Sequence, residues 1–304
     1  MTRVAAVDCG TNSIRLLVAE VDPSSGELVE LDRRMIIVRL GQGVDRTGRL
    51  APEALERTFA ACREYAAAIA QHGVKRVRFV ATSATRDAEN RADFVRGVVD
   101  ILGVEPEVIT GDQEAELSFT GATGELPGHE ERLVVDIGGG STEFVIGRDR
   151  VEAARSVDIG CVRLTERHVR SDPPSAAELA AVRVDIEAAL DLAEETVPLR
   201  GARTLVGLAG SVATVAGIAL GLDAYDSRAI HHSRISRAAV AEIVRTLAAA
   251  THDERAAIPV MHPGRVDVIV PGALVLLAIM ERIGADEVVV SEHDILDGIA
   301  ASIA

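Results

Sequence analysis

Two short glycine-rich segments, Asp8–Ser13 and Asp136–Ser141, are the parts of this sequence best suited to chemistry by residue type and spacing. Glycines let the backbone approach a ligand closely, and consecutive N–H groups in a tight turn bind anions. Either segment alone could be an ordinary hairpin turn. Their repetition behind matched aspartates predicts two phosphate-binding loops. The predicted donors are Gly10, Thr11, Asn12 and Ser13 in the first loop, and Gly138, Gly139, Gly140 and Ser141 in the second.

Carboxylates in and after these loops suit a hard cation. Asp136 and Glu143 carry the oxygen ligands that Mg²⁺ prefers, and Asp8 is the matched candidate in the first loop. The formal charge of the chain is −15, so a bound polyanion needs screening, which Mg²⁺ bridging two phosphate oxygens would supply. Mn²⁺ is a substitute ion. Arg15 and Arg86 are the predicted cationic clamps, because a guanidinium offers fork-like donors to phosphate, although Arg15 could instead pair at the surface.

The elements that would position the first loop alternate between strands and helices. Hydrophobic patterning predicts strands on both sides of Asp8–Ser13, a helix opened by Pro52 and a helix opened by Gly111. Arg86 is expected in a loop that follows a strand at 76–81. The predicted order is βββαβαβα, which is typical of a mixed sheet covered by helices.

The pattern of the first half returns after residue 128. Asp136, Gly138 and Ser141 line up with Asp8, Gly10 and Ser13. A helix at 176–195, a strand at 205–209 followed by a turn and a helix, and a strand at 288–291 repeat the later elements. A repeat of this length is a duplicated domain rather than a solenoid.

The sequence therefore predicts an α/β protein of two domains, each with a mixed sheet and flanking helices. Domain I is expected at 1–120, domain II at 121–292, and a C-terminal helix that could return to domain I at 293–304. A stretch rich in glycine, proline and threonine at 121–128 marks the boundary. We expect the two loops to face each other across an active-site cleft.

Composition excludes several other functions. A chain with 47 acidic and 32 basic side chains lacks the broad positive field that a nucleic-acid polymer requires. Lys75, the only lysine, is followed by arginine, which excludes a Walker A loop. The three cysteines are too far apart for a zinc motif or a disulfide framework. The uncharged stretch at 204–222 is interpreted as strand, turn and helix rather than a membrane span, and no secretory signal is recognisable. We expect a cytoplasmic protein that binds neither nucleic acid polymers nor membranes.

Two further patterns carry less weight. Cys9 and Arg15 have the Cys-x5-Arg spacing of cysteine-dependent phosphatases, but Asp8 disfavours a thiolate and the loop joins two strands. We interpret Cys9 as a small buried residue. His231 and His232 are adjacent, which predicts two rings that point apart and a surface or turn role rather than a metal site.

Five segments together resemble the exopolyphosphatase and guanosine pentaphosphate phosphohydrolase (Ppx/GppA) family: 8–15, 81–90, 110–115, 136–143 and 265–273. The resemblance implies the duplicated actin-like (ribonuclease H-like) ATPase-type fold, removal of terminal phosphate from polyphosphate or pppGpp, and a homodimer. It implies that Glu114 is the general base that activates the attacking water. The other implied site residues are Arg86, Asp136 and Glu143 for catalysis and Ser83 for binding phosphate. Position alone would make Glu114 a helix-capping carboxylate.

The sequence departs from that family in three places. Gln113 stands where many members carry a second glutamate, and Leu296 stands where an arginine is usual. The sequence also ends at Ala304, without the helical HD-like domain of longer members. We therefore expect a preference for short polyphosphate chains.

Four functions stay open at this point. The first is an exopolyphosphatase, and the second is a pppGpp 5′-phosphohydrolase in which the segment 207–211 holds the nucleoside. The third is a non-enzymatic regulator that binds polyphosphate or an alarmone. The fourth is a sugar kinase of the same fold.

Overall fold

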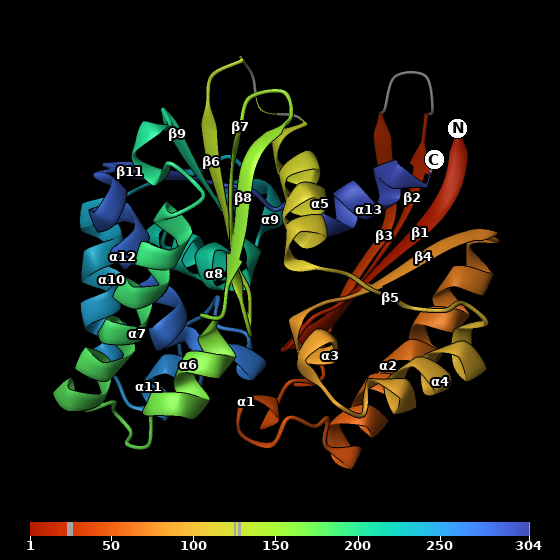
Figure 1. Ribbon diagram of the computed structural model, residues 1–304, viewed down its shortest axis with the longest axis horizontal. Coiled ribbons are helices and arrows are strands. Elements are labelled where there is room, and N and C mark those ends of the chain that lie inside the picture. The colour runs from red at the N-terminus through yellow and green to blue at the C-terminus, as the bar shows by residue number, and fades with distance from the viewer. Residues whose placement is uncertain (23–26, 125, 127–128, 304) are drawn as a thin grey trace. The chain divides into compact units, whose positions relative to one another are not determined.

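The computed structural model describes residues 1–22, 27–124, 126 and 129–303 (Figure 1). The chain forms two compact units. Unit 1 comprises residues 1–124 together with 294–304, and unit 2 comprises residues 125–293. Part of the expected boundary at 121–128 lies outside the described residues, and its first three residues are helical.

Unit 1 contains a mixed five-stranded sheet in the order β3-β2-β1-β4-β5. β1 pairs antiparallel with β2 and parallel with β4, as expected when a hairpin is followed by a helical crossover. The strands are β1 (Thr2–Cys9), β2 (Ser13–Val21), β3 (Leu28–Ile37), β4 (Arg76–Ala81) and β5 (Glu107–Val108). The helices are α1 (Val44–Thr47), α2 (Pro52–Gln71), α3 (Ser83–Asp87), α4 (Arg91–Leu102), α5 (Gly111–Thr123) and α13 (Ile295–Ser302).

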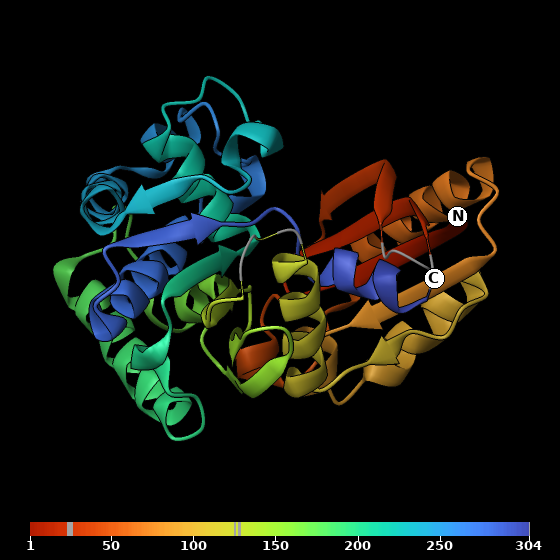
Figure 2. The same cartoon turned by 90° about the horizontal axis from the view of Figure 1, so that it is seen from above.

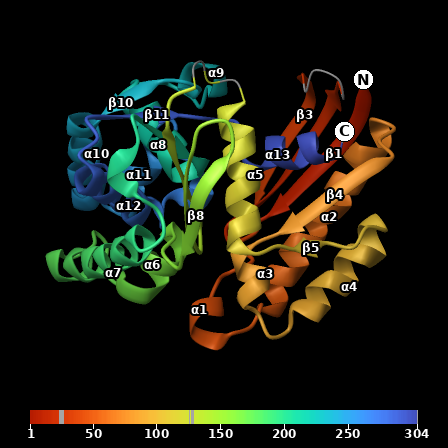
Figure 3. The ribbon, with the colours of Figure 1, turned by 45° about the horizontal axis from the view of Figure 1, so that its top comes forward.

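Both faces of this sheet are covered because β1 is apolar on both sides. Ala5 and Val7 belong to a core that includes residues of α2 and α4. Val4 and Ala6 belong to a second core that includes Ile299 of α13. Alternate residues of a strand point to opposite faces, so α2 with α4 and α13 lie on opposite sides of the sheet (Figure 1). α5 runs alongside α13 (Figure 3).

Unit 2 repeats this plan around a six-stranded sheet in the order β10-β11-β9-β6-β7-β8. β10 and β11 run in opposite directions at its edge (Figure 2). The strands are β6 (Arg132–Ile137), β7 (Thr142–Gly147), β8 (Val151–Val157), β9 (Thr204–Leu208), β10 (Arg234–Ser236) and β11 (Glu287–Val290). The helices are α6 (Cys161–His168), α7 (Ala176–Glu194), α8 (Ala209–Ala219), α9 (Ser227–Ile230), α10 (Arg237–Ala249), α11 (His252–Ala256) and α12 (Ile269–Ile283), with 3₁₀ turns at Leu199–Gly201 and Pro263–Arg265.

The two sheets share one topology. In unit 1 the order β3-β2-β1-β4-β5 matches β8-β7-β6-β9-β11 in unit 2, strand by strand. In both units the first strand pairs antiparallel with the second and parallel with the fourth. This arrangement is the duplicated actin-like fold, as predicted.

Two local predictions are wrong. Arg86 lies in the short helix α3 rather than in a loop, because Ser83 begins a helical turn directly after β4. No separate turn follows β9, since α8 begins at Ala209, whose backbone reaches the left-handed region with φ of 68°. None of the described helices is long and apolar enough to cross a membrane.

The adjacent histidines lie in a turn, as predicted, but the expectation that their rings point apart is wrong. The rings of His231 and His232 stack with centroids 3.7 Å apart. His232 has a φ of 62°, so the backbone between the two residues follows neither helix nor strand geometry, and the expected alternation of side chains does not apply.

Candidate functional site

The first glycine loop is the turn of the β1–β2 hairpin. The amide of Gly10 donates to the carbonyl of Ser13 over 3.0 Å, which closes the turn. The carbonyl oxygen of Thr11 accepts from Gly41 at 2.9 Å, and that of Asn12 accepts from Arg39 at 2.8 Å. Since the carbonyl and the next amide of a trans peptide point in opposite directions, these contacts direct the amides of Asn12 and Ser13 away from the segment at 38–41.

The second loop, between β6 and β7, is built in the same way. Gly138 donates to the carbonyl of Ser141 over 3.0 Å. The start of α6 binds the carbonyls behind the turn. Gly138 accepts from Cys161 at 3.0 Å, Gly139 from Val162 at 2.9 Å, and Gly140 from the Arg163 guanidinium at 2.7 Å. The amides of Gly139, Gly140 and Ser141 therefore point away from α6.

This second loop leaves no room for a side chain at Gly160. A Cβ there would lie 2.4 Å from the carbonyl carbon of Gly139 and 2.5 Å from the amide nitrogen of Gly140. Only glycine permits so close an approach of two backbone segments.

Each hairpin places a charged residue opposite its aspartate. Asp8 pairs in register with Arg15, and Asp136 pairs in register with Glu143. In unit 1 the Arg15 Nε and Nη2 atoms donate to Asp8 Oδ2 at 3.0 and 2.7 Å. In unit 2 Glu143 is fully buried, and its Oε1 accepts from the Ser156 hydroxyl at 2.7 Å. One hairpin therefore pairs acid with base, and the other pairs two acids.

Asp8 is buried below the first loop. Burial raises the pKa of this carboxyl group, although the Arg15 guanidinium acts to lower it. Among the residues that the structure describes, no group donates a hydrogen bond to Asp8 Oδ1. A buried carboxylate oxygen without a donor is costly, so this atom is suited to a cation or a bound water.

Glu114 and Arg86 form the second polar pair of unit 1. Arg86 Nη1 donates to Glu114 Oε2 at 3.1 Å and to the carbonyl of Ile109 at 3.0 Å. Glu114 is a buried residue of α5, with 8% of its surface exposed. The capping box of α5 is made by Thr110 and Gln113, whose side chain accepts from the Thr110 amide at 3.0 Å. Gln113 therefore performs the capping that position alone assigned to Glu114.

Ser83 contributes a hydroxyl beside the first loop. Its Oγ lies 2.9 Å from the Thr11 Oγ1 atom, and both residues are buried. This contact joins the start of α3 to the turn of the β1–β2 hairpin.

The described residues include no group of three or more His, Cys, Asp or Glu side chains placed to hold a metal ion. Mg²⁺ usually keeps several waters and takes only one or two protein carboxylates together with substrate phosphate oxygens. Asp8, with its Oδ1 lacking a donor, fits that chemistry, and so do the buried carboxylates Asp136 and Glu143. The residues present therefore suit a cation that substrate helps to hold.

Cys9 lies in the hydrophobic core of unit 1. Burial raises the pKa of this thiol well above its usual range, and Cys62 and Asp8 add to the effect. The loop joins two strands, as the sequence predicted. These surroundings stabilise a thiol rather than the thiolate that a cysteine phosphatase needs.

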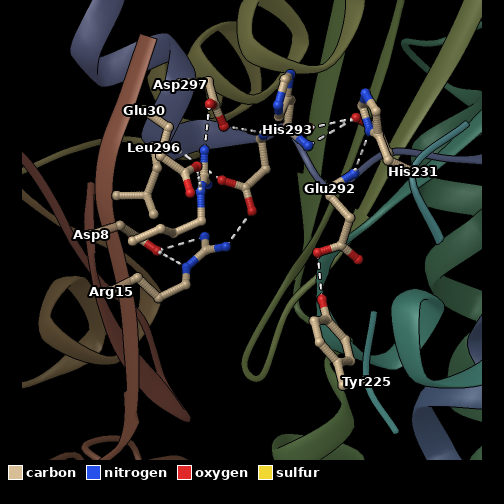
Figure 4. A network of polar contacts seen from close by, with 12 residues as sticks. Asp8, Arg15, Glu30, Tyr225, His231, Glu292, His293, Leu296 and Asp297 are labelled. Carbon is tan, nitrogen blue, oxygen red and sulfur yellow. Dashed lines mark hydrogen bonds and ion pairs between the residues drawn. The ribbon is translucent and has the colours of Figure 1, made fainter. Parts of the chain in front are cut away.

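Sequence analysis missed Asp294, which completes the polar network around Arg15. Figure 4 shows Arg15, Asp8 and Asp297 in this network. Arg15 Nη1 donates to Asp294 Oδ2. Asp294 is the N-cap of α13, and Asp297 completes its capping box and accepts from Arg33 Nη2 at 2.6 Å. Although burial opposes its charge, Asp297 and Asp294 raise the pKa of Arg33. The signal available in the sequence was the Asp-x-x-Asp spacing of a capping box.

Leu296 lies in the first turn of the same helix. It is buried in the core that α13 forms against the sheet of unit 1. An apolar residue at this position therefore packs where an arginine would need a polar partner.

Comparison with known proteins shows what the chain resembles. The model of the Ppx/GppA phosphatase family matches residues 17–304. Exopolyphosphatase 2 of Mycobacterium tuberculosis is 52% identical over 100% of this chain and 99% of its own length. Guanosine-5′-triphosphate,3′-diphosphate pyrophosphatase of Photobacterium profundum is 34% identical over 71% of this chain and 43% of its own length. The crystal structure of an exopolyphosphatase-like protein, 42% identical, superposes with a TM-score of 0.94 and covers 99% of this chain and 97% of that one.

Proposed function

Since the chain belongs to the Ppx/GppA phosphatase family, we propose that it is an exopolyphosphatase that releases terminal orthophosphate from inorganic polyphosphate. The observation that carries the proposal is the ion pair between Glu114 and Arg86 in unit 1, beside a loop built to direct amides outward. A relative named as an exopolyphosphatase aligns along the whole chain. Phosphoryl transfer depends mainly on positioning and charge neutralisation, which these groups supply.

Glu114 acts as the general base. The Arg86 guanidinium, 3.1 Å away, stabilises its carboxylate form, which is the form that accepts a proton. The water oxygen attacks the terminal phosphorus in line, the bond from phosphorus to the bridging oxygen breaks, and the proton of the water passes to Glu114. The products are orthophosphate and a chain that is one phosphate shorter.

The two loops bind the phosphates. The outward-directed amides are the donors, and they belong to Asn12, Ser13, Gly139, Gly140 and Ser141. The hydroxyls of Ser13, Ser83 and Ser141 add to them, and Gly138 closes the second turn through its own amide. Gly10 and Thr11 shape the first turn. Arg86 supplies positive charge next to Glu114, and Arg15 supplies it next to Asp8.

In unit 2 Asp136 and Glu143, and in unit 1 Asp8, are the residues that would hold Mg²⁺ or Mn²⁺. Such an ion, when bound, neutralises charge that develops on the phosphate oxygens. The Ser156 hydroxyl orients Glu143 for this role.

A second function is favoured by one relative, which is named for guanosine-5′-triphosphate,3′-diphosphate. In unit 2 the Arg265 guanidinium lies directly over Gly210, where a Cβ would fall 1.0 Å from its Nη1 atom. If pppGpp is the substrate, the segment 207–211 would hold its guanosine next to Arg265. Removal of its 5′-phosphate would follow the same chemistry.

The decisive experiment measures phosphate release from tripolyphosphate, long-chain polyphosphate and pppGpp in the presence of Mg²⁺. We expect tripolyphosphate to be the best substrate, whereas a clear preference for pppGpp would establish the second function. Glu114→Gln should lose most turnover and keep substrate binding, and Cys9→Ser should stay active. Tight binding of polyphosphate by the wild type without hydrolysis would instead identify a regulator.

The proposal extends to a homodimer in the cytoplasm. Light scattering on the purified protein should give twice the mass of 32.1 kDa. Fractionation of cells that express the chain should recover it with cytoplasmic markers.

A further inference from the structure

The Arg15 guanidinium binds only one of the two carboxylate oxygens of Asp8. An arginine normally meets a carboxylate as two forks, with one N–H on each oxygen. Here Nε and Nη2 both donate to the same atom, Asp8 Oδ2, at 3.0 and 2.7 Å. The remaining nitrogen, Nη1, donates to Asp294 Oδ2.

This geometry leaves Asp8 Oδ1 uncovered by Arg15. Within the part of the chain that the structure describes, that atom is buried and accepts no hydrogen bond, and only 5% of the residue's surface is exposed. The two aspartates and the arginine together carry a formal charge of about −1 when both carboxyl groups are ionised, which favours a cation over an anion at this oxygen.

We propose that Asp294 is a positioning residue: its ion pair with Arg15 keeps the guanidinium away from Asp8 Oδ1, so this oxygen remains available to the divalent cation. The inference rests on the proposed function, because it assigns Asp8 to the cation. Without the charge of Asp294, Arg15 is expected to turn into the two-fork geometry and cover Oδ1. The cation would then compete with a guanidinium and would meet a site with one negative charge fewer.

Asp294 is well anchored for this task. Its Oδ1 accepts from the Leu296 amide at 3.0 Å, which leaves Oδ2 to Arg15. The helix that it caps packs closely on α5, because a Cβ at Gly298 would lie 2.1 Å from the carbonyl oxygen of Leu117. Helix α13 therefore presents the Asp294 carboxylate from a fixed position.

The test is Mn²⁺ binding to the purified full-length chain, followed by electron paramagnetic resonance, with Mg²⁺ as competitor. Asp294→Asn removes the charge, and its amide oxygen can still cap α13. We expect the Mn²⁺ dissociation constant to rise about tenfold or more, which is the usual effect of removing a group that orients a metal ligand. Asp294→Glu should recover part of the affinity.

Asp297→Asn is the matched control. It removes a carboxylate from the same capping box and the same kind of ion pair, but that pair involves Arg33 rather than Arg15. We expect its Mn²⁺ affinity to stay near that of the wild type. Thermal unfolding of each variant shows whether it folds. If Asp294→Asn does not fold, Asp294→Ser replaces it, because serine also caps a helix.

Three results would overturn the inference. The first is a folded Asp294→Asn variant that binds Mn²⁺ as tightly as the wild type. The second is a loss of Mn²⁺ affinity in Asp297→Asn equal to the loss in Asp294→Asn. The third is an Asp8→Asn variant whose Mn²⁺ affinity is not reduced. Failure of the proposed function would look different. A protein that binds Mn²⁺ through Asp8 but releases no phosphate would contradict the proposed activity and leave the role of Asp294 intact.

Discussion

Arg15 and Glu143 occupy the same register position in two copies of one hairpin. Arg15 faces Asp8 across β1 and β2, and Glu143 faces Asp136 across β6 and β7. Each hairpin closes with the same bond between a glycine amide and a serine carbonyl, at 3.0 Å. The two copies therefore share the backbone of the loop and differ in the sign of the charge on one side chain at the same register position.

This difference predicts the effect of Glu143→Gln. The glutamine oxygen can still accept from the Ser156 hydroxyl, so the fold should persist, but the charge that favours a cation is lost. We expect the Mg²⁺ concentration for half-maximal phosphate release to rise at least about tenfold. Glu152→Gln on β8 is the control and should behave as wild type. An unchanged Mg²⁺ requirement would remove Glu143 from the cation site.

The Arg86–Glu114 pair predicts a defect in turnover. Arg86→Lys keeps a positive charge, but the ammonium group sits on a flexible stem and does not reproduce the planar guanidinium whose Nη1 donates to both Glu114 and the carbonyl of Ile109. We expect kcat to fall by about a hundredfold, as when one transition-state donor is removed. Arg78→Lys, in the ion pair with Glu107 on the same sheet, should leave kcat unchanged. Equal losses in both variants would indicate a structural effect instead.

Most of the fold could be predicted because its signals are local. β4 has the predicted bounds, and the helices begin at Pro52 and Gly111 as their patterns indicated. The repeat of the two hairpins was visible in the sequence since both turns need the same residues at the same spacing. Asp294 was missed because it lies 279 residues from Arg15, and a contact over that distance depends on where α13 packs.

The prediction that the rings of His231 and His232 point apart failed for a different reason. The sequence rule assumes a regular backbone, and the left-handed φ of His232 breaks that assumption. Such a conformation is uncommon outside glycine, so nothing in the local sequence indicated it. Arg15 shows a third limit, because its residue type indicates a clamp for anions but not which anion. In unit 1 the structure gives it two carboxylates.

Glu178 predicts an acid-sensitive contribution to stability in unit 2. Hydrogen bonds from the Ser171 hydroxyl and from the amide and hydroxyl of Ser175 lower the pKa of this carboxyl group to about 2, and it closes the capping box of α7. A group whose pKa falls on folding stabilises the native state above its usual pKa of 4.5. That contribution should be lost as the pH falls from about 4.5 to about 2.

The measurement is the free energy of unfolding of wild type and Glu178→Gln across this pH range. The variant should be less stable at neutral pH, and the difference should shrink as the pH is lowered through the range. Glu195→Gln, at the exposed C-terminal end of the same helix, should show no such trend. A difference that stays constant with pH would mean that ionised Glu178 is not the stabilising form.

Gly121 predicts how tightly α13 is held against α5. A Cβ at this position would lie 1.8 Å from the carbonyl oxygen of Asp294 and 3.0 Å from the amide nitrogen of Gly298. Both atoms belong to the backbone, so α13 would have to move. We expect Gly121→Ala to lower the free energy of unfolding by about 2 kcal/mol, within the usual range for overpacking.

Gly124→Ala on the same segment is the control for this prediction. Gly124 has helical angles, and the nearest atom to its Cβ would be the carbonyl oxygen of Thr120 at 3.5 Å, an ordinary contact. Alanine at such a site reduces the entropy of the unfolded chain, so a gain of up to about 1 kcal/mol is expected in urea unfolding. Because Gly121→Ala displaces Asp294 as well as α13, it should also weaken Mn²⁺ binding, whereas Gly124→Ala should not. A destabilised Gly121→Ala protein with unchanged Mn²⁺ affinity would separate the packing of α13 from the positioning of Arg15.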